Sequence, residues 1–125
     1  MRLLLDTHAL LWWLDDNPRL GQQARRAIAD PDNEVWISAV CVWEITIKQA
    51  LGKLTMGGDL GQVIDDNRFG NLPITAKHAL AVGSLPPIHR DPFDRLLVAQ
   101  TGLEKLVLVT GDTNIGQYQV SILWN

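Results

Sequence analysis

Short apolar runs alternate with amphipathic segments along this chain. The runs at residues 2–5, 34–37 and 106–109 consist mostly of Leu, Val, Ile and Trp, which is typical of strands that are buried on both faces of a parallel sheet. Two shorter strands are expected at residues 72–74 and 120–123. The pattern therefore predicts an α/β domain in which helices cover both faces of a central parallel sheet.

Capping residues and turn residues separate the expected helices. These helices are expected at residues 7–14, 21–29, 38–51, 60–67, 76–84 and 92–102. Ser38 and Thr75 are good N-caps, and Asp91 followed by Pro92 is a typical helix start. No repeat, linker or low-complexity segment interrupts this order, so residues 1–125 are expected to form a single domain.

Two carboxylates directly follow the most apolar of the expected strands. Asp6 comes after the run 2–5, and Asp112 follows the run 106–109 with Thr110 and Gly111 between them. Ligands of open parallel sheets bind beyond the carboxyl ends of the strands, where both acids are expected to lie. Because an unpaired buried carboxylate costs several kcal/mol, a bound divalent cation is the simplest reason to place acids there.

Two further acids lie on expected helices. Glu44 falls on the apolar side of the helix at 38–51, whereas a solvated glutamate would lie opposite. That apolar stripe is expected to consist of Val40, Trp43, Ile47 and Leu51. The alternative for Glu44 is an ion pair with Lys48 one turn later. Asp94 lies in the first turn of the helix at 92–102.

Each of the other three acids also has an ordinary structural explanation. Asp6 is a possible N-cap of the helix at 7–14, and Asp112 a possible turn residue after a strand. Asp94 occupies the third helical position after an Asp91 cap, where an acid favours the helix dipole. Taken together with Glu44, however, the four acids favour a cation site.

The formal net charge of −3 counts against a nucleic-acid partner, since such proteins are usually basic. If the four acids bind a cation, the remaining residues carry a formal charge of +1, so a polyanionic substrate is not excluded. Side chains expected to line the acidic pocket and contact phosphates are Lys48, Lys53, His89, Arg90 and Arg95.

Several other site types lack their sequence signatures. The single cysteine, Cys41, lies in an apolar stretch and is expected to be a buried thiol. The three histidines show no zinc-ligand spacing, and there is neither a P-loop nor a nucleophile elbow. No apolar run is long enough to cross a membrane and no signal peptide is evident, so a cytoplasmic protein is expected.

Four segments resemble, in order, the motifs of the PIN domain, and in particular those of VapC-type toxin ribonucleases from bacterial toxin–antitoxin pairs. The segments are 3–12 (LLLDTHALLW), 38–45 (SAVCVWEI) with Lys48 and 52–54 (GKL) behind it, 89–100 (HRDPFDRLLVAQ) and 109–112 (VTGD). The resemblance spans the whole chain. Thr101 departs from it, because a small apolar residue is expected there, and this affects packing rather than chemistry.

The resemblance implies a three-layer α/β/α PIN domain with a short central parallel sheet. It also implies a Mg²⁺- or Mn²⁺-dependent ribonuclease that leaves 5′-phosphate and 3′-hydroxyl ends. The implied metal-binding and catalytic residues are Asp6, Glu44, Asp94 and Asp112. Side chains expected to support these acids or to contact the substrate are Thr7, Lys48, Asp91, Arg95, Thr110 and Asn114.

The resemblance further implies a homodimer that binds a small VapB-like antitoxin. The sequence supports such contacts through the stretch Leu10-Leu11-Trp12-Trp13, which is more apolar than one face of a short helix can bury. Two alternatives are a non-catalytic metal-binding PIN adaptor and a receiver-like signalling domain. A receiver requires a lysine just after a late strand, where this chain has Thr110-Gly111-Asp112, and a haloacid-dehalogenase-type phosphatase requires an acid at the position of His8.

Overall fold

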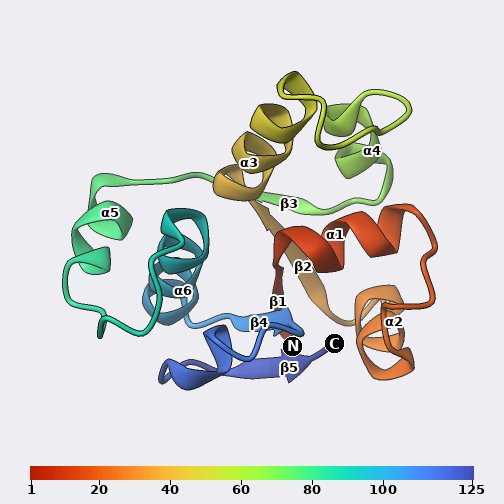
Figure 1. The fold of residues 1–125 in the computed structure, drawn as a ribbon. Helices are drawn as coiled ribbons and strands as arrows, with labels where there is room; N and C mark the ends of the chain where they lie inside the picture. Colours follow the sequence, from red (N-terminus) through yellow and green to blue (C-terminus); the bar gives the residue numbers. More distant parts are fainter.

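The computed structural model describes residues 1–125 and contains one five-stranded parallel sheet (Figure 1). Its strands are β1 (Arg2–Leu5), β2 (Glu34–Ser38), β3 (Gly70–Leu72), β4 (Val107–Thr110) and β5 (Ile122–Trp124). They are ordered β3-β2-β1-β4-β5, and every neighbouring pair is parallel. The predicted parallel α/β class is confirmed.

Six α-helices and one short 3₁₀ helix connect the strands. They are α1 (Thr7–Leu14), α2 (Gln22–Ala29), α3 (Ala39–Ala50), α4 (Leu60–Asp66), α5 (Ala76–Val82), α6 (Pro92–Glu104) and η1 (Ile115–Gln117). The predicted N-caps are confirmed, since the side chains of Ser38, Thr75 and Asp91 all accept hydrogen bonds from the first turns of their helices. None of the helices is long and apolar enough to span a bilayer.

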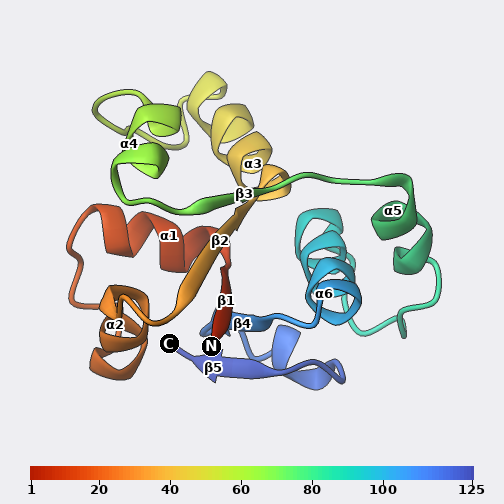
Figure 2. The same cartoon turned by 180° about the vertical axis from the view of Figure 1, so that it is seen from behind.

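The sheet forms the middle of three layers. Figures 1 and 2 show α1 and α2 on one side of it and α5 and α6 on the other. Side chains of β1 alternate between the two faces, so Leu3 and Leu5 belong to the core under α1 and α2, whereas Leu4 belongs to the core under α6. All three leucines are fully buried, as the apolar run predicts.

Several predicted boundaries differ from the structure by one to a few residues, and three of the differences have a clear physical reason. β3 ends at Leu72 rather than at residue 74, because Pro73 has no N–H with which to continue the ladder. α6 passes Gly102 and ends at Glu104, and the next residue, Lys105, adopts a left-handed conformation with φ 55°. The last strand starts at Ile122 rather than at residue 120, because η1 and the turn after it use the residues before this strand.

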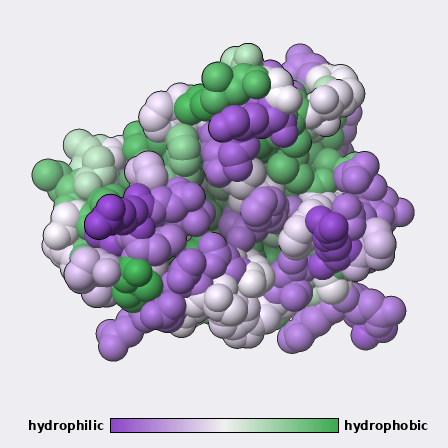
Figure 3. Space-filling view, in the orientation of Figure 1, coloured by the Kyte–Doolittle hydropathy of each residue, from purple (hydrophilic) through white to green (hydrophobic).

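The prediction of which residues of α3 form its buried face was wrong in part. The buried residues of this helix are Val40, Cys41, Glu44 and Ile45. Trp43 and Leu51 are 57% and 63% exposed, because α3 turns its buried face toward α1 and α6. Apolar side chains gather on the surface at the top of Figure 3, where the C-terminal end of α3 lies. Glu44 is nevertheless on the buried face, as predicted.

Candidate metal centre

Asp6 and Asp112 lie beyond the carboxyl ends of two neighbouring strands. The chain proceeds outward from β1 through β2 and β3 on one side and through β4 and β5 on the other. The direction of winding therefore reverses between β1 and β4, which is where ligands bind in open parallel sheets. The backbone N–H of Asp6 also donates to the Val109 carbonyl at 3.1 Å, so the two strand ends are directly connected.

Asp6 is buried at this edge. Its Oδ1 accepts a hydrogen bond of 2.8 Å from the Ala9 N–H, so the N-cap explanation is correct as well. Burial raises the pKa of Asp6 above its ordinary value, and repulsion from Asp112 adds to this effect, whereas hydrogen bonds from Thr110 and Ala9 oppose it. Capping uses one carboxylate oxygen and does not remove the cost of ionising this group in a buried place.

Glu44 reaches the same region from the second turn of α3. Thr7 donates a hydrogen bond of 2.6 Å to its Oε1, and the Lys48 ammonium lies 2.9 Å from its Oε2. The ion pair considered from the sequence is therefore present. Only 8% of Glu44 is exposed, so Lys48 neutralises a carboxylate that is otherwise cut off from water. A cation that binds here must share Glu44 with Lys48 or displace it.

Asp94 and Asp112 form the most open part of the cluster. Ligand atoms of Asp94, Asp112 and His89 all lie within 4.8 Å of one another. Burial raises the pKa of Asp94 to about 6, and repulsion from Asp91, Asp112 and Glu44 contributes, while a hydrogen bond from His89 opposes the shift. Asp94 and Asp112, which are distant in sequence, are thus close together in the fold.

The residues expected to support the acids have distinct positions. Asp91 caps α6, and its Oδ1 accepts from the N–H groups of Phe93 and Asp94. Thr110 is fully buried and its hydroxyl accepts from the Asp112 N–H at 3.0 Å. The Asn114 N–H donates to Asp112 Oδ1 at 2.8 Å, so Asn114 acts through its backbone rather than its side chain.

Arg95 was expected to contact phosphate, but its side chain is hydrogen-bonded to a loop of the protein itself. Its guanidinium donates to the backbone carbonyls of Val82, Leu85, Pro86 and His89 at 2.8–3.4 Å. It therefore organises the loop before α6. Lys53 and Arg90, the other expected phosphate contacts, have exposed side chains. Sequence reasoning placed His89 only as a substrate contact, since nothing in the sequence shows that the loop folds it back onto Asp94.

Cys41 lies in the buried wall of the cluster. Burial raises the pKa of its thiol to about 12, and the negative charges of Asp6, Glu44 and Asp94 contribute. The thiol therefore stays protonated at neutral pH and donates to the Leu5 carbonyl at 3.6 Å. The predicted buried, unpaired cysteine is confirmed.

The donor set fits a hard divalent cation. Each carboxylate has one oxygen held by a hydrogen bond from the protein: Ala9 holds Asp6, Thr7 holds Glu44, His89 holds Asp94 and Asn114 holds Asp112. The second oxygens of Asp94 and Asp112 accept no hydrogen bond from the protein. Oxygen ligands of this kind suit Mg²⁺ and Mn²⁺.

Comparison with known families agrees with this geometry. The family model described as PIN domain matches residues 3–121. The chain belongs to the PIN-domain family. The receiver-like alternative is thereby excluded. No curated protein matches the chain in sequence.

Solved structures share the fold of this PIN domain across its length. VapBC2 from Rickettsia felis, bound to a promoter DNA fragment, matches with a TM-score of 0.70 and 14% identity, covering 100% of this chain and 99% of that chain. VapBC-1 from nontypeable Haemophilus influenzae matches with a TM-score of 0.63 and 19% identity, covering 100% and 97%. FitAcB from Neisseria gonorrhoeae matches with a TM-score of 0.62 and 19% identity, covering 98% and 96%.

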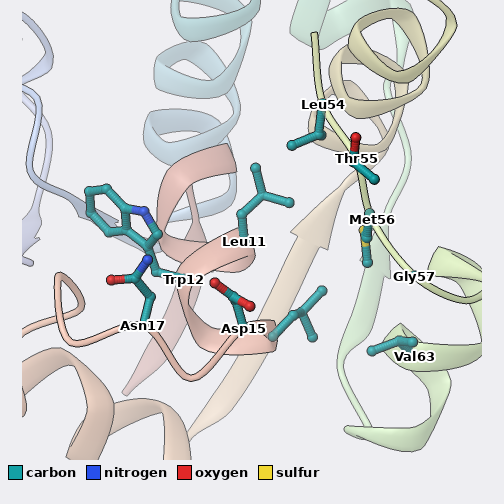
Figure 4. Close-up of a pocket in the computed structure, with 10 residues that line it drawn as sticks. Leu11, Trp12, Asp15, Asn17, Leu54, Thr55, Met56, Gly57 and Val63 are labelled. Carbon is teal, nitrogen blue, oxygen red and sulfur yellow. The ribbon is translucent and has the colours of Figure 1, made fainter. Parts of the chain in front are cut away.

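The PIN domain has a separate cavity of about 490 Å³ beside α1. In Figure 4, Leu11 of α1 lies across this cavity from Leu54 and Met56 of the segment before α4, and Trp12 lies beside Asn17 on the other side of Leu11. None of the four acids lines it. In the stretch Leu10-Leu11-Trp12-Trp13, Leu10 is thus fully buried in the core, whereas Leu11 and Trp12 line the cavity.

Proposed function

We propose that this PIN domain is a cytoplasmic endoribonuclease toxin of a toxin–antitoxin pair, which hydrolyses RNA phosphodiester bonds with Mg²⁺ or Mn²⁺. The observation that supports the proposal is the grouping of Asp94 and Asp112, whose ligand atoms lie within 4.8 Å of each other, at the β1–β4 edge. Burial and repulsion from Asp112 raise the pKa of Asp6, and burial and repulsion from Asp91, Asp112 and Glu44 raise that of Asp94. The order of the family motifs and the fold shared with VapBC toxin–antitoxin complexes support the toxin assignment.

Asp6, Glu44, Asp94 and Asp112 would hold a divalent cation, which would supply an activated water and neutralise charge on the scissile phosphate. The protein's own part is to keep the ligands in place. Backbone N–H groups of Ala9 and Asn114 fix one oxygen each of Asp6 and Asp112, and Thr7 fixes Glu44. Ligands that are fixed beforehand need little reorganisation when charge develops during the reaction. Lys48, whose side chain is 39% exposed, offers a positive charge beside the acids to an approaching phosphate.

A non-catalytic adaptor is the alternative within the family. An adaptor without catalysis has no need for four ligands, and each additional buried carboxylate lowers the stability of the metal-free fold. The complete quartet in this chain therefore favours an enzyme.

Cleavage of a labelled single-stranded RNA by the purified protein tests the proposal. We expect cleavage with Mg²⁺ or Mn²⁺, complete inhibition by EDTA and recovery when excess cation is added back, because ligands without a cation cannot activate water. Asp6→Asn protein, purified in the same way, controls for contaminating ribonucleases. Cleavage that continues in EDTA, or that Asp6→Asn retains at the wild-type rate, would contradict the proposal.

For partners, we propose a homodimer and a small VapB-like antitoxin whose C-terminal segment covers apolar surface and brings a basic residue to the acids. The cavity beside α1 offers apolar surface to such a segment, and an arginine pairs well with carboxylates. Light scattering at micromolar concentration is expected to give twice the chain mass of 13.9 kDa. Substituting the arginine of the antitoxin should restore cleavage while the complex persists. A monomeric toxin, or a complex whose inhibition ignores that arginine, would refute this arrangement.

A further inference from the structure

A line of side chains connects the loop before α6 with the acids. The Arg95 guanidinium lies 3.0 Å from the Tyr118 hydroxyl, and this hydroxyl lies 2.8 Å from Nδ1 of His89. The other ring nitrogen, Nε2, lies 3.4 Å from Oδ2 of Asp94. Tyr118 is only 4% exposed, so water does not compete readily for its hydroxyl. None of these contacts was expected from the sequence.

The two ends of this line fix the direction of every hydrogen bond in it. A guanidinium has only donors, so the Tyr118 oxygen accepts from Arg95. The only other partner of that hydroxyl is His89. If Nδ1 carried a hydrogen, the buried Tyr118 hydrogen would have no acceptor, so the hydroxyl donates to Nδ1. At the opposite end an ionised Asp94 is purely an acceptor, which requires a hydrogen on Nε2 of His89. Both ends therefore select the same neutral tautomer, in which Nε2 carries the hydrogen.

This tautomer decides what His89 can offer to a cation. A ring nitrogen of His89 lies within 4.8 Å of ligand atoms of Asp94 and Asp112, close enough to complete a mixed nitrogen–oxygen site, and Nε2 is the nitrogen that faces Asp94. A nitrogen that carries a hydrogen has no lone pair for a metal, and the lone pair of Nδ1 is used by Tyr118. His89 is thus placed among the ligands but prevented from being one.

We propose that the Arg95–Tyr118 pair determines metal selectivity: it holds His89 as a hydrogen-bond donor, so that the centre presents only oxygen ligands. The proposal rests on the proposed metal centre. Imidazole favours Ni²⁺ and Zn²⁺, which already bind most sites more tightly than Mn²⁺ does, whereas carboxylate and water ligands suit Mg²⁺ and Mn²⁺. Withholding the imidazole lone pair therefore reduces competition from Ni²⁺ and Zn²⁺. His89 is a positioning residue that acts through Asp94.

Removing the Tyr118 hydroxyl tests this inference. Tyr118→Phe keeps the ring but takes the donor away from Nδ1, so the hydrogen of His89 can move to Nδ1 and Nε2 can bind metal. Titration calorimetry with Ni²⁺ and with Mn²⁺ is expected to show Ni²⁺ affinity rising about 10- to 100-fold in Tyr118→Phe, the range over which partners of metal ligands act. Mn²⁺ affinity should change much less.

His89→Ala completes a double-mutant cycle with Tyr118→Phe. Alone, His89→Ala removes the hydrogen bond that positions Asp94 but no ligand, so it should lower Ni²⁺ and Mn²⁺ affinity by similar factors. Combined with Tyr118→Phe, it should abolish the Ni²⁺ gain. Equal Ni²⁺ affinities of wild type and Tyr118→Phe would overturn the inference, and so would a loss in His89→Ala alone that is much larger for Ni²⁺ than for Mn²⁺.

Nitrogen NMR of His89 in the metal-free wild type gives an answer even if Tyr118→Phe does not fold. The expected spectrum shows hydrogen on Nε2 and none on Nδ1 at neutral pH. Hydrogen on Nδ1 would overturn the inference. These measurements need no RNA cleavage. If His89 has the other tautomer, only the inference about Arg95 and Tyr118 fails. If the metal centre itself is wrong, the wild type will not bind Mn²⁺.

Discussion

Asp94→Asn is expected to reduce RNA cleavage by at least about 100-fold, the order of loss seen when one group that stabilises the transition state is removed. The substitution keeps the shape of the side chain and an oxygen that can accept from His89. It removes one negative charge from the ligands that Asp94 and Asp112 provide together. A weaker centre activates water less effectively and binds the scissile phosphate less tightly.

The same substitution should stabilise the metal-free protein. The pKa of Asp94 is raised from 3.8 to about 6, so folding favours the protonated form of this carboxyl group. Its unfavourable contribution is therefore absent below pH 3.8, grows as the pH rises to about 6 and is fully present at neutral pH. Because Asp94 is partly open to solvent, we expect Asp94→Asn to recover only about 1–2 kcal/mol at pH 7.

Cleavage rates and melting temperatures in EDTA at pH 7 measure both effects. The expected rise in melting temperature is about 3–8 °C for a domain of this size. Asp32→Asn is the matched control, because the side chain of Asp32 is exposed in the turn before β2. It should change neither quantity. Wild-type cleavage by Asp94→Asn would show that Asp94 is not a ligand, and a lower melting temperature would show that its negative charge stabilises the fold.

Glu44→Gln is expected to reduce the stabilisation that Mn²⁺ gives to the protein. A cation at 100 times its dissociation constant stabilises the folded state by about 2.7 kcal/mol, and a tenfold weaker site gains only about 1.4 kcal/mol at the same concentration. The amide introduced by this substitution carries no charge and is a weaker ligand, although its oxygen can still accept from Thr7 as Glu44 does at 2.6 Å. The rate of RNA cleavage should fall together with the stabilisation that Mn²⁺ gives to the folded protein.

Lys48→Met separates the two roles of Glu44. It breaks the 2.9 Å ion pair while leaving the carboxylate in place. If Glu44 is a metal ligand, Lys48→Met keeps the Mn²⁺-dependent rise in melting temperature that Glu44→Gln loses. If Glu44 serves only the ion pair, both variants lose similar stability without metal and respond to Mn²⁺ as the wild type does. That second outcome would remove Glu44 from the centre.

The sequence was sufficient to find the acids because their positions follow from simple patterns. Apolar runs identify β1 and β4, and an acid just beyond each of them is placed at the carboxyl edge of a parallel sheet. Asp91 and Pro92 identify the start of α6, and so the first-turn position of Asp94. These are local signals, which a sequence records directly.

What the sequence did not reveal depends on contacts between distant segments. Strand order decides that β1 and β4 are neighbours, and no local pattern encodes it. The buried face of α3 was predicted to include Trp43, but contacts with α1 and α6 turned Cys41 and Ile45 inward instead, while Glu44 is buried as predicted. Arg95 looked like a phosphate contact, because a charged residue in a motif carries no sign that a loop will wrap around its guanidinium.

The identity of the RNA ends produced by cleavage tests the central claim most directly. Water activated by a cation at Asp6, Glu44, Asp94 and Asp112 would attack phosphorus from outside the RNA, so the 3′-oxygen would leave. Wild type with Mg²⁺ or Mn²⁺ should therefore give 5′-phosphate and 3′-hydroxyl ends, and Asp6→Asn should give no products above background. Fragments ending in 2′,3′-cyclic phosphate would contradict the claim, because they would show that the 2′-hydroxyl of the RNA had attacked in place of water.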